Sequence, residues 1–297
     1  MESTGHGPQA RVLLAWLSDA QARTALAGAG RAGEHTAAGE ALLAAARAAL
    51  ASRPAGLDQA GLIRPLPGEL RGYVQRLAAD PQAAGYLADG FTPGLVDLSR
   101  LCVFQPSVHT GEITERVAGV PAGDVSALAG ITLPLAAPPP VIPQFDQERL
   151  TFTTNLASQN LHIVGAFGGP AEDDLPPGTV SVGFHLRVIT SFVQVASIQG
   201  RYFLRDGYHR CLGLIQRGVR YAPALVRPDL PLADLVPPGM LEFEAFMGGR
   251  PPVLPDYWDD RVSCPVPAAA PRKVILVRAS ELSVTEPAAP MVFRPPA

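Results

Sequence analysis

The segment 201–220, RYFLRDGYHRCLGLIQRGVR, constrains the fold most strongly because it predicts three successive elements. Apolar residues at Tyr202–Leu204 indicate a strand, and the Asp206–Gly207 pair indicates a tight turn. The apolar spacing that follows predicts a helix over Tyr208–Arg217, which ends at a glycine. This order of elements predicts a strand that is joined to a helix by a tight turn.

Positive charge is concentrated around this predicted helix. Residues 201–227 contain six arginines and one acid, Asp206, in a chain of net charge -3. A helix N-terminus presents unpaired N–H groups and the positive end of the helix dipole. His209 and Arg210 in the first turn add cationic groups there, so we expect an anion or carboxylate nearby. One interpretation is a phosphate bound by the turn amides and these two side chains. The alternative is that Asp206 caps the helix and pairs with Arg210 without a ligand.

Composition limits the class of protein. With 47% hydrophobic and 17% charged residues among 297, the chain predicts a globular protein, and we expect two domains. A pI near 6.1 does not fit a general nucleic-acid binder, so DNA is not an expected partner. Three widely spaced cysteines indicate neither a disulfide framework nor a zinc ribbon. Without a leader or a long apolar run, we expect a cytoplasmic protein with no membrane association.

The chain divides by pattern into three parts. Residues 1–90 predict a helical subdomain that serves as a lid or docks a protein partner, with Val12, Leu13, Trp16 and Leu17 on one helix face and a further helix near 68–79. Residues 91–285 predict an α+β domain with a Pro-rich surface connection near 119–143. Residues 286–297 predict a flexible tail.

Strand patterns dominate the second half. Alternating apolar residues predict a strand over Val180–Val188 with one wet face, and Phe192–Ile198 with Tyr202–Leu204 predicts a hairpin. The hydrophobic run RKVILVRAS, Arg272–Ser280, predicts a final buried strand.

Two segments together resemble the ParB and sulfiredoxin superfamily. They are VDLSRLCVFQPSV (Val96–Val108) and FVQVASIQGRYFLRDGYHRCLGLIQRGVRYAPALV (Phe192–Val226). The resemblance implies an α+β fold with a mixed sheet core that binds nucleotide phosphates. It also implies phosphate contacts from Gly207, His209 and Arg210, with Gln105 beside them.

The chain departs from both named branches of this superfamily. Tyr208 stands where sulfiredoxins carry a nucleophilic cysteine, and Ser107 follows Gln-Pro where partition proteins have arginine. The sequence therefore predicts a divergent member, without sulfinic acid repair or a chromosome-partition role.

The other candidate residues do not belong to any motif that would bring them together in a site. His109 lies near Glu112 and Glu115, which is typical of a solvated loop or of a base beside a nucleotide. His162 and His185 have no metal-ligand spacing, and the Glu172–Asp174 run predicts a loop tip. We therefore predict no metal site.

The sequence favours a nucleotide- or phosphate-binding protein, with hydrolysis or phosphoryl transfer left open. The binding residues would be Asp206, Gly207, His209, Arg210 and Gln105. The ligand would be a nucleotide or another phosphorylated small molecule, and the sequence does not identify a cofactor beyond a nucleoside triphosphate with Mg²⁺ as one candidate. The alternative is a non-catalytic interaction protein or DNA-associated adaptor, whose Asp206–Arg210 turn is neutralised internally.

Overall fold

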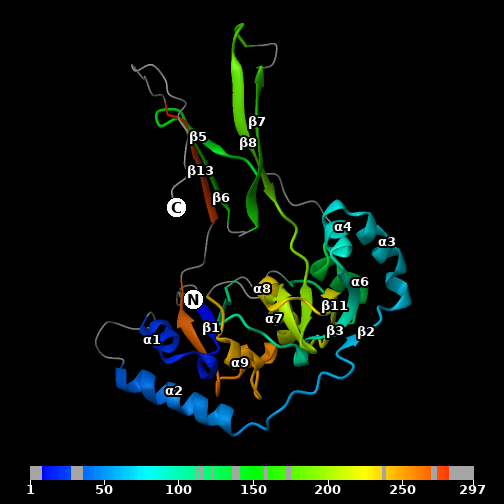
Figure 1. Ribbon diagram of the computed structural model, residues 1–297, viewed down its shortest axis with the longest axis vertical. Coiled ribbons are helices and arrows are strands. Elements are labelled where there is room, and N and C mark those ends of the chain that lie inside the picture. The colour runs from blue at the N-terminus through cyan, green and yellow to red at the C-terminus, as the bar shows by residue number, and fades with distance from the viewer. Residues whose placement is uncertain are drawn as a thin grey trace, which may run out of the picture. The chain divides into compact units, whose positions relative to one another are not determined.

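The computed structural model describes residues 9–27, 36–111, 113, 117–121, 123–135, 141–156, 160–170, 175–235, 239–268 and 273–280. The fold is mixed α+β with several sheets (Figure 1). The chain forms two compact units: unit 1 comprises residues 1–138 and 189–270, and unit 2 comprises residues 139–188 and 271–297. Each unit is therefore built from two separate stretches of chain, and the boundary predicted at residue 90 lies inside unit 1.

The main sheet of unit 1 has five strands in the order β10-β9-β11-β3-β2. The hairpin of β9 and β10 is antiparallel, β11 runs parallel to β9, and α7 (Tyr208–Gln216) makes the crossover between β10 and β11. The predicted order of hairpin, turn, helix and strand is thus confirmed. The strands are β2 (Ile63–Arg64), β3 (Thr92–Asp97), β9 (Gln194–Ile198), β10 (Arg201–Asp206) and β11 (Tyr221–Arg227).

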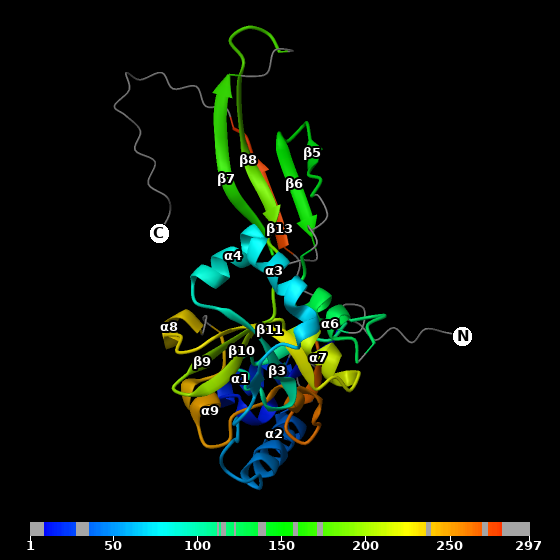
Figure 2. The same cartoon turned by 90° about the vertical axis from the view of Figure 1, so that its right-hand side faces the viewer.

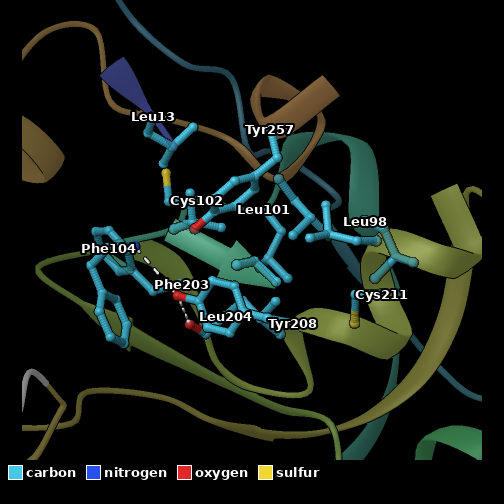
Figure 3. Packing of buried hydrophobic residues seen from close by; sticks show 14 of the residues in the cluster. Leu13, Leu98, Leu101, Cys102, Phe104, Phe203, Leu204, Tyr208, Cys211 and Tyr257 are labelled. Atoms are coloured by element: carbon cyan, nitrogen blue, oxygen red, sulfur yellow. Dashed lines mark hydrogen bonds between the residues drawn. The ribbon is translucent and has the colours of Figure 1, made fainter. Parts of the chain in front are cut away.

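The core of unit 1 lies where this sheet meets α7. All five residues of β9 are buried, which suits the parallel neighbour on one side and the hairpin partner on the other. Figure 3 shows Phe203 and Leu204 of β10 beside Tyr208 of α7, all buried. The helix is thereby fixed to the end of the strand that precedes it.

The prediction of a first helix that includes Val12 is wrong, because this residue belongs to a second, three-stranded sheet. Val12 belongs to a strand, and the run Leu13–Leu17 is buried all round instead of on one face. The extended backbone is imposed by two antiparallel partners that lie far away in sequence. The sheet order is β12-β1-β4, with β1 (Gln9–Val12), β4 (Ser107–His109) and β12 (Cys264–Pro267).

The remaining N-terminal segments are helical. The helix predicted near 68–79 is confirmed as α3 (Arg71–Ala79), and α4 (Pro81–Ala88) follows it. Asp80 separates them, and its carboxylate accepts from the N–H groups of Gln82 and Ala83, each at 2.9 Å. The others are α1 (Asp19–Ala27) and α2 (Thr36–Ala51), with 3-10 turns at Leu14–Trp16, Gly68–Leu70, Leu98–Arg100 and Leu254–Trp258.

The Pro-rich connection predicted near 119–143 contains a helix, α6 (Val125–Thr132). Asp124 is the N-cap residue, its carboxylate accepts from the Ala127 N–H, and the helix buries Leu128 and Ala129. The consecutive prolines lie outside the described residues. Two short helices follow later, α8 (Leu232–Leu235) and α9 (Phe243–Met247). Among the helices described, none has the length and apolar character needed to cross a bilayer.

Unit 2 consists of a three-stranded sheet and a long hairpin (Figure 2). The predicted strand over Val180–Val188 is confirmed, but the last strand is not buried as predicted, because Val274 and Leu276 are 54% and 62% exposed. The sheet order is β13-β6-β5, with β5 (Gln144–Asp146), β6 (Thr151–Leu156) and β13 (Lys273–Arg278), and the hairpin is β7 (Leu161–Pro170) with β8 (Val180–Val188).

Candidate functional site

The two sequence segments that carry the resemblance meet in unit 1. Cys102 donates its N–H to Tyr202 O at 3.1 Å and accepts from Leu204 N at 2.9 Å. The Tyr208 hydroxyl donates to Leu204 O at 2.9 Å and accepts from Phe104 N at 3.4 Å (Figure 3). The segment that contains the Gln-Pro step therefore runs beside the end of β10 and the start of α7.

Gln105 is anchored through its backbone. Its carbonyl oxygen accepts a hydrogen bond from the buried Tyr257 hydroxyl. Its side-chain amide is partly exposed and makes no hydrogen bond with any residue that the structure describes. The backbone is thus held one residue from the contact between Phe104 and Tyr208, and the amide remains available to solvent.

Gly207 is required by packing. Its φ of 97° lies in the left-handed region, and a Cβ at this position would lie 2.7 Å from Val193 Cγ2. Gly207 occupies the N-cap position of α7, and no side chain caps the helix. The prediction that Asp206 caps the helix is therefore wrong: its Oδ1 accepts at 2.6 Å from the Gly207 N–H, one residue too early to serve the first helical turn.

Arg210 makes its described contacts with protein groups. Nη1 donates to the carbonyl oxygens of Ser191 at 2.7 Å and Ile131 at 3.1 Å, and Nη2 donates to the Ser191 hydroxyl at 2.8 Å. That hydroxyl in turn donates to Asp206 Oδ2 at 2.7 Å. The charges of Arg210 and Asp206 are linked through one serine hydroxyl, and the two side chains form no direct salt bridge.

His209 lies in the same first turn of α7. Its side chain is half-buried, and both His209 and Arg210 have interactions in addition to those given above. The structure therefore places Asp206, Gly207, His209 and Arg210 together at one turn, as their positions in the sequence require.

The other arginines of residues 201–227 are dispersed over separate elements. Their acceptors are mainly backbone and amide oxygens, so the local excess of positive charge does not converge on one point. Arg201 donates to Phe246 O and Gly248 O, Arg205 to Gln194 Oε1, Arg217 to Val120 O and Arg220 to Asp97, while Arg227 lies over the ring of Phe91.

Asp97 forms ion pairs with Arg100 and Arg220 at the end of β3. Its carboxylate is buried, and it accepts from Arg220 at 2.9 Å and from Arg100 at 3.1 Å. Burial alone would raise its pKa, but the hydrogen bonds from Arg220, Ser99 and Arg100 outweigh burial and lower the pKa to about 2. Sequence reasoning did not identify this residue, although an acid followed at the third position by an arginine was a visible signal.

The thiols near the turn are not activated. Burial raises the pKa of Cys102 to about 12 and that of Cys211 to about 12. Burial also raises the pKa of the Tyr208 hydroxyl. All three groups keep their protons at neutral pH, so none of them is a ready nucleophile.

The histidines in the described residues contact different neighbours and do not form a common site. His162 Nδ1 lies 3.4 Å from Lys273 Nζ, and the His185 ring packs on Phe167 with centroids 5.0 Å apart. His109 belongs to β4, and its Nδ1 is buried without a hydrogen-bond partner. No group of three His, Cys, Asp or Glu side chains in the described residues is arranged to hold a metal ion. The predicted neighbours Glu112 and Glu115, and the run Glu172–Asp174, lie outside the described residues.

Unit 2 contains a feature that sequence reasoning missed. A cavity of about 640 Å³ is lined by the β13-β6-β5 sheet and by the β7-β8 hairpin. The alternation of Val182, Phe184 and Leu186 along β8 was recognised as a strand pattern, and these residues line the cavity. The pattern could not predict the second wall of the cavity, because that wall comes partly from β13, which lies far along the chain.

Comparison with known proteins gives no assignment. No family model matches this chain, and no match was found to a curated protein or to a solved structure. The resemblance of residues 96–108 and 192–226 to the ParB and sulfiredoxin superfamily therefore stays a prediction.

Proposed function

We propose that this chain is a non-catalytic binding protein, in which the Asp206–Arg210 turn is neutralised internally. The observation that carries the proposal is the set of hydrogen bonds from Arg210 to Ser191 and Ile131. A guanidinium has five N–H donors, and three of the contacts made here go to protein oxygens. These protein oxygens leave fewer guanidinium donors for a phosphate at this turn.

These contacts give Arg210 a structural role. Ile131 lies in α6, shortly before the chain leaves unit 1, and Ser191 lies just after the chain returns at residue 189. One guanidinium therefore joins the outgoing and the returning segments. The Val193 N–H reinforces the same junction by donating to Thr132 O at 2.7 Å. An arginine at the start of α7 is thus explained by the chain it holds together.

Two buried side chains at the start of α7 are poorly suited to catalysis. They are Tyr208 and Cys211, and burial raises the pKa of both. General acid–base and nucleophilic catalysis need groups whose pKa lies near the working pH. Neither group meets that condition.

Calorimetric titration tests the proposal. Wild-type protein is titrated with CTP, ATP, a non-hydrolysable analogue and inorganic phosphate, and we expect no saturable heat. Arg210→Ala is the test variant, and Arg217→Ala is the matched control, since Arg217 is the C-cap residue of the same helix and its side chain donates only to Val120 O among the described groups. We expect Arg210→Ala to lower the free energy of unfolding by roughly 1–3 kcal/mol without changing the ligand response.

The contrary result is equally specific. Saturable nucleotide heat that disappears in Arg210→Ala and persists in Arg217→Ala would replace the proposal with the predicted nucleotide site. Should Arg210→Ala fail to fold, His209→Ala provides the same comparison in the first turn of α7.

A further inference from the structure

The cavity in unit 2 has the size of a small-molecule site. Its volume of about 640 Å³ falls within the range of roughly 300–1,000 Å³ that is usual for such sites. Its two walls come from the β13-β6-β5 sheet and the β7-β8 hairpin, and Figure 2 shows these strands.

The strand register explains why an apolar face forms on each wall. Phe145, Phe152 and Val277 stand directly opposite one another across β5, β6 and β13, and the two phenylalanine rings are 4.5 Å apart. On the hairpin, Val182 faces Gly168 and Phe184 faces Ala166. Large side chains therefore stand opposite small ones along the hairpin, which leaves space above the face.

The lining side chains remain exposed although they are large and apolar. Phe145, Phe152 and Phe184 are 51%, 48% and 49% exposed, and Val182 is 79% exposed. Contiguous apolar surface of this kind is uncommon on a soluble chain unless it receives a partner or ligand. The polar side chains of the lining are limited to Thr154 and Arg278.

Arg278 gives the cavity a single charge. It is the last residue of β13, it is exposed, and it forms no ion pair with any residue of the described part of the chain. The nearby Arg149 is instead paired with Asp146 at 3.8 Å. No acid lines the cavity, so its charge is complementary to an anion.

We infer that unit 2 binds a free fatty acid, with the hydrocarbon chain in the cavity and the carboxylate on Arg278. This inference rests on the proposed binding function and adds its ligand class. A guanidinium can hold a carboxylate through two parallel hydrogen bonds. Sugars, nucleotides and peptides fit poorly, because their many polar groups would lose hydrogen bonds to water against an apolar lining.

The lining presents an extended apolar surface to an acyl chain. Val182, Phe184 and Leu186 share one face of β8, and this stretch covers about 13 Å at the usual rise along a strand. The two phenylalanines of β5 and β6 and the aliphatic residues of β13 form the opposite wall.

Fluorescence titration with cis-parinaric acid, followed by displacement with palmitate, tests binding. We expect saturable binding with one equivalent per chain. Val182→Gln should weaken it at least tenfold, and Val180→Gln is the matched control, since Val180 belongs to the same strand, is 66% exposed and does not line the cavity. Absence of saturable binding, or an equal effect of both substitutions, would overturn the inference.

The role of the charge is tested with a second pair of variants. Arg278→Gln should weaken palmitate binding about tenfold and leave hexadecanol binding unchanged, with both affinities calculated from the displacement curves and the affinity of the probe for each variant. Arg187→Gln is the control, because Arg187 is a cation of β8 outside the cavity lining. Equal palmitate affinity in wild type and Arg278→Gln would remove the assigned carboxylate contact.

Two further readouts exclude other occupants. Co-sedimentation with phosphatidylcholine and phosphatidylglycerol vesicles, without binding of monomeric palmitate, would replace the inference with a membrane surface. A dimer that Val182→Gln dissociates would replace it with a second copy of the chain. The nucleotide titrations report on unit 1, whereas the palmitate titrations report on unit 2. A failure of palmitate binding therefore does not affect the result of the nucleotide titrations.

Discussion

Arg210 holds Ser191 at two points: Nη1 donates to the serine carbonyl oxygen at 2.7 Å and Nη2 to the serine hydroxyl at 2.8 Å. A hydroxyl has one hydrogen and two lone pairs, so the Ser191 hydroxyl accepts from Arg210 while it donates to Asp206. The serine therefore connects an arginine and an aspartate that do not touch, and its own position fixes where the chain re-enters unit 1.

We expect Ser191→Ala to lower the free energy of unfolding by roughly 1–3 kcal/mol, because Arg210 and Asp206 would each lose a partner in a partly buried site. Urea denaturation measures the change. Ser181→Ala serves as control, since Ser181 makes no hydrogen bond through its side chain to the residues described. Equal midpoints for the two variants would contradict the role assigned to Ser191.

Gly207→Ala should destabilise the protein more than Gly218→Ala. Both glycines have positive φ, 97° and 76°, so both substitutions impose backbone strain of roughly 1–2 kcal/mol. A Cβ at position 218 meets open space, whereas at position 207 it would contact Val193, which adds roughly 1–3 kcal/mol of overpacking. Thermal or urea unfolding gives the comparison.

The double variant Gly207→Ala with Val193→Ala separates the two causes. Measured against Val193→Ala alone, to allow for the cost of truncating a buried side chain, it should recover part of the extra loss, because the obstructing methyl group is removed. No recovery would mean that the steric contact with Val193 does not account for the difference.

Asp97→Asn should lower stability at neutral pH by about 2 kcal/mol, the value that corresponds to a pKa lowered from 3.8 to about 2. The lowered pKa means that the carboxylate stabilises the fold above pH 3.8, and that this contribution is lost as the pH falls toward 2. The gap between wild type and variant should therefore narrow across this window in urea titrations at successive pH values. A gap that is constant with pH would exclude ionisation as its cause.

Cys102 and Cys211 should resist alkylation in the folded protein. With pKa values of about 12, the thiolate fraction at pH 8 is on the order of one in ten thousand, and both thiols are buried. Iodoacetamide followed by peptide mapping should modify neither residue without denaturant and both in urea. Rapid modification of native Cys211 would reinstate a reactive thiol beside the turn.

Local signals made part of the fold predictable. The hairpin turn at Gln199–Gly200, the Asp206–Gly207 turn and Gly218 each restrict the backbone within a few residues, and the elements between them were located correctly. β1 was mistaken for a helix because its strand conformation depends on β4 and β12, which are distant in sequence. The helix α6 was hidden by the prolines and glycines around it.

The candidate site, like the fold, was only partly predictable from the sequence. The turn was located from the strand and helix patterns on either side of it, whereas the position of the Gln105 segment beside it was predicted only from the family resemblance. Ser191 was not foreseen, because an ordinary serine gives no sign that an arginine nineteen residues later will use both of its oxygens. The cavity was missed for a related reason: its walls combine strands from both stretches of unit 2.

The pairing of β6 with β13 has a consequence for biosynthesis. More than a hundred residues separate these strands, so at roughly 5–20 residues per second the earlier one waits on the order of ten seconds for its neighbour to emerge. During that interval its open edge and Phe152 are accessible to other nascent chains. Unit 2 must therefore mature late, and chaperone supply during translation should govern its yield.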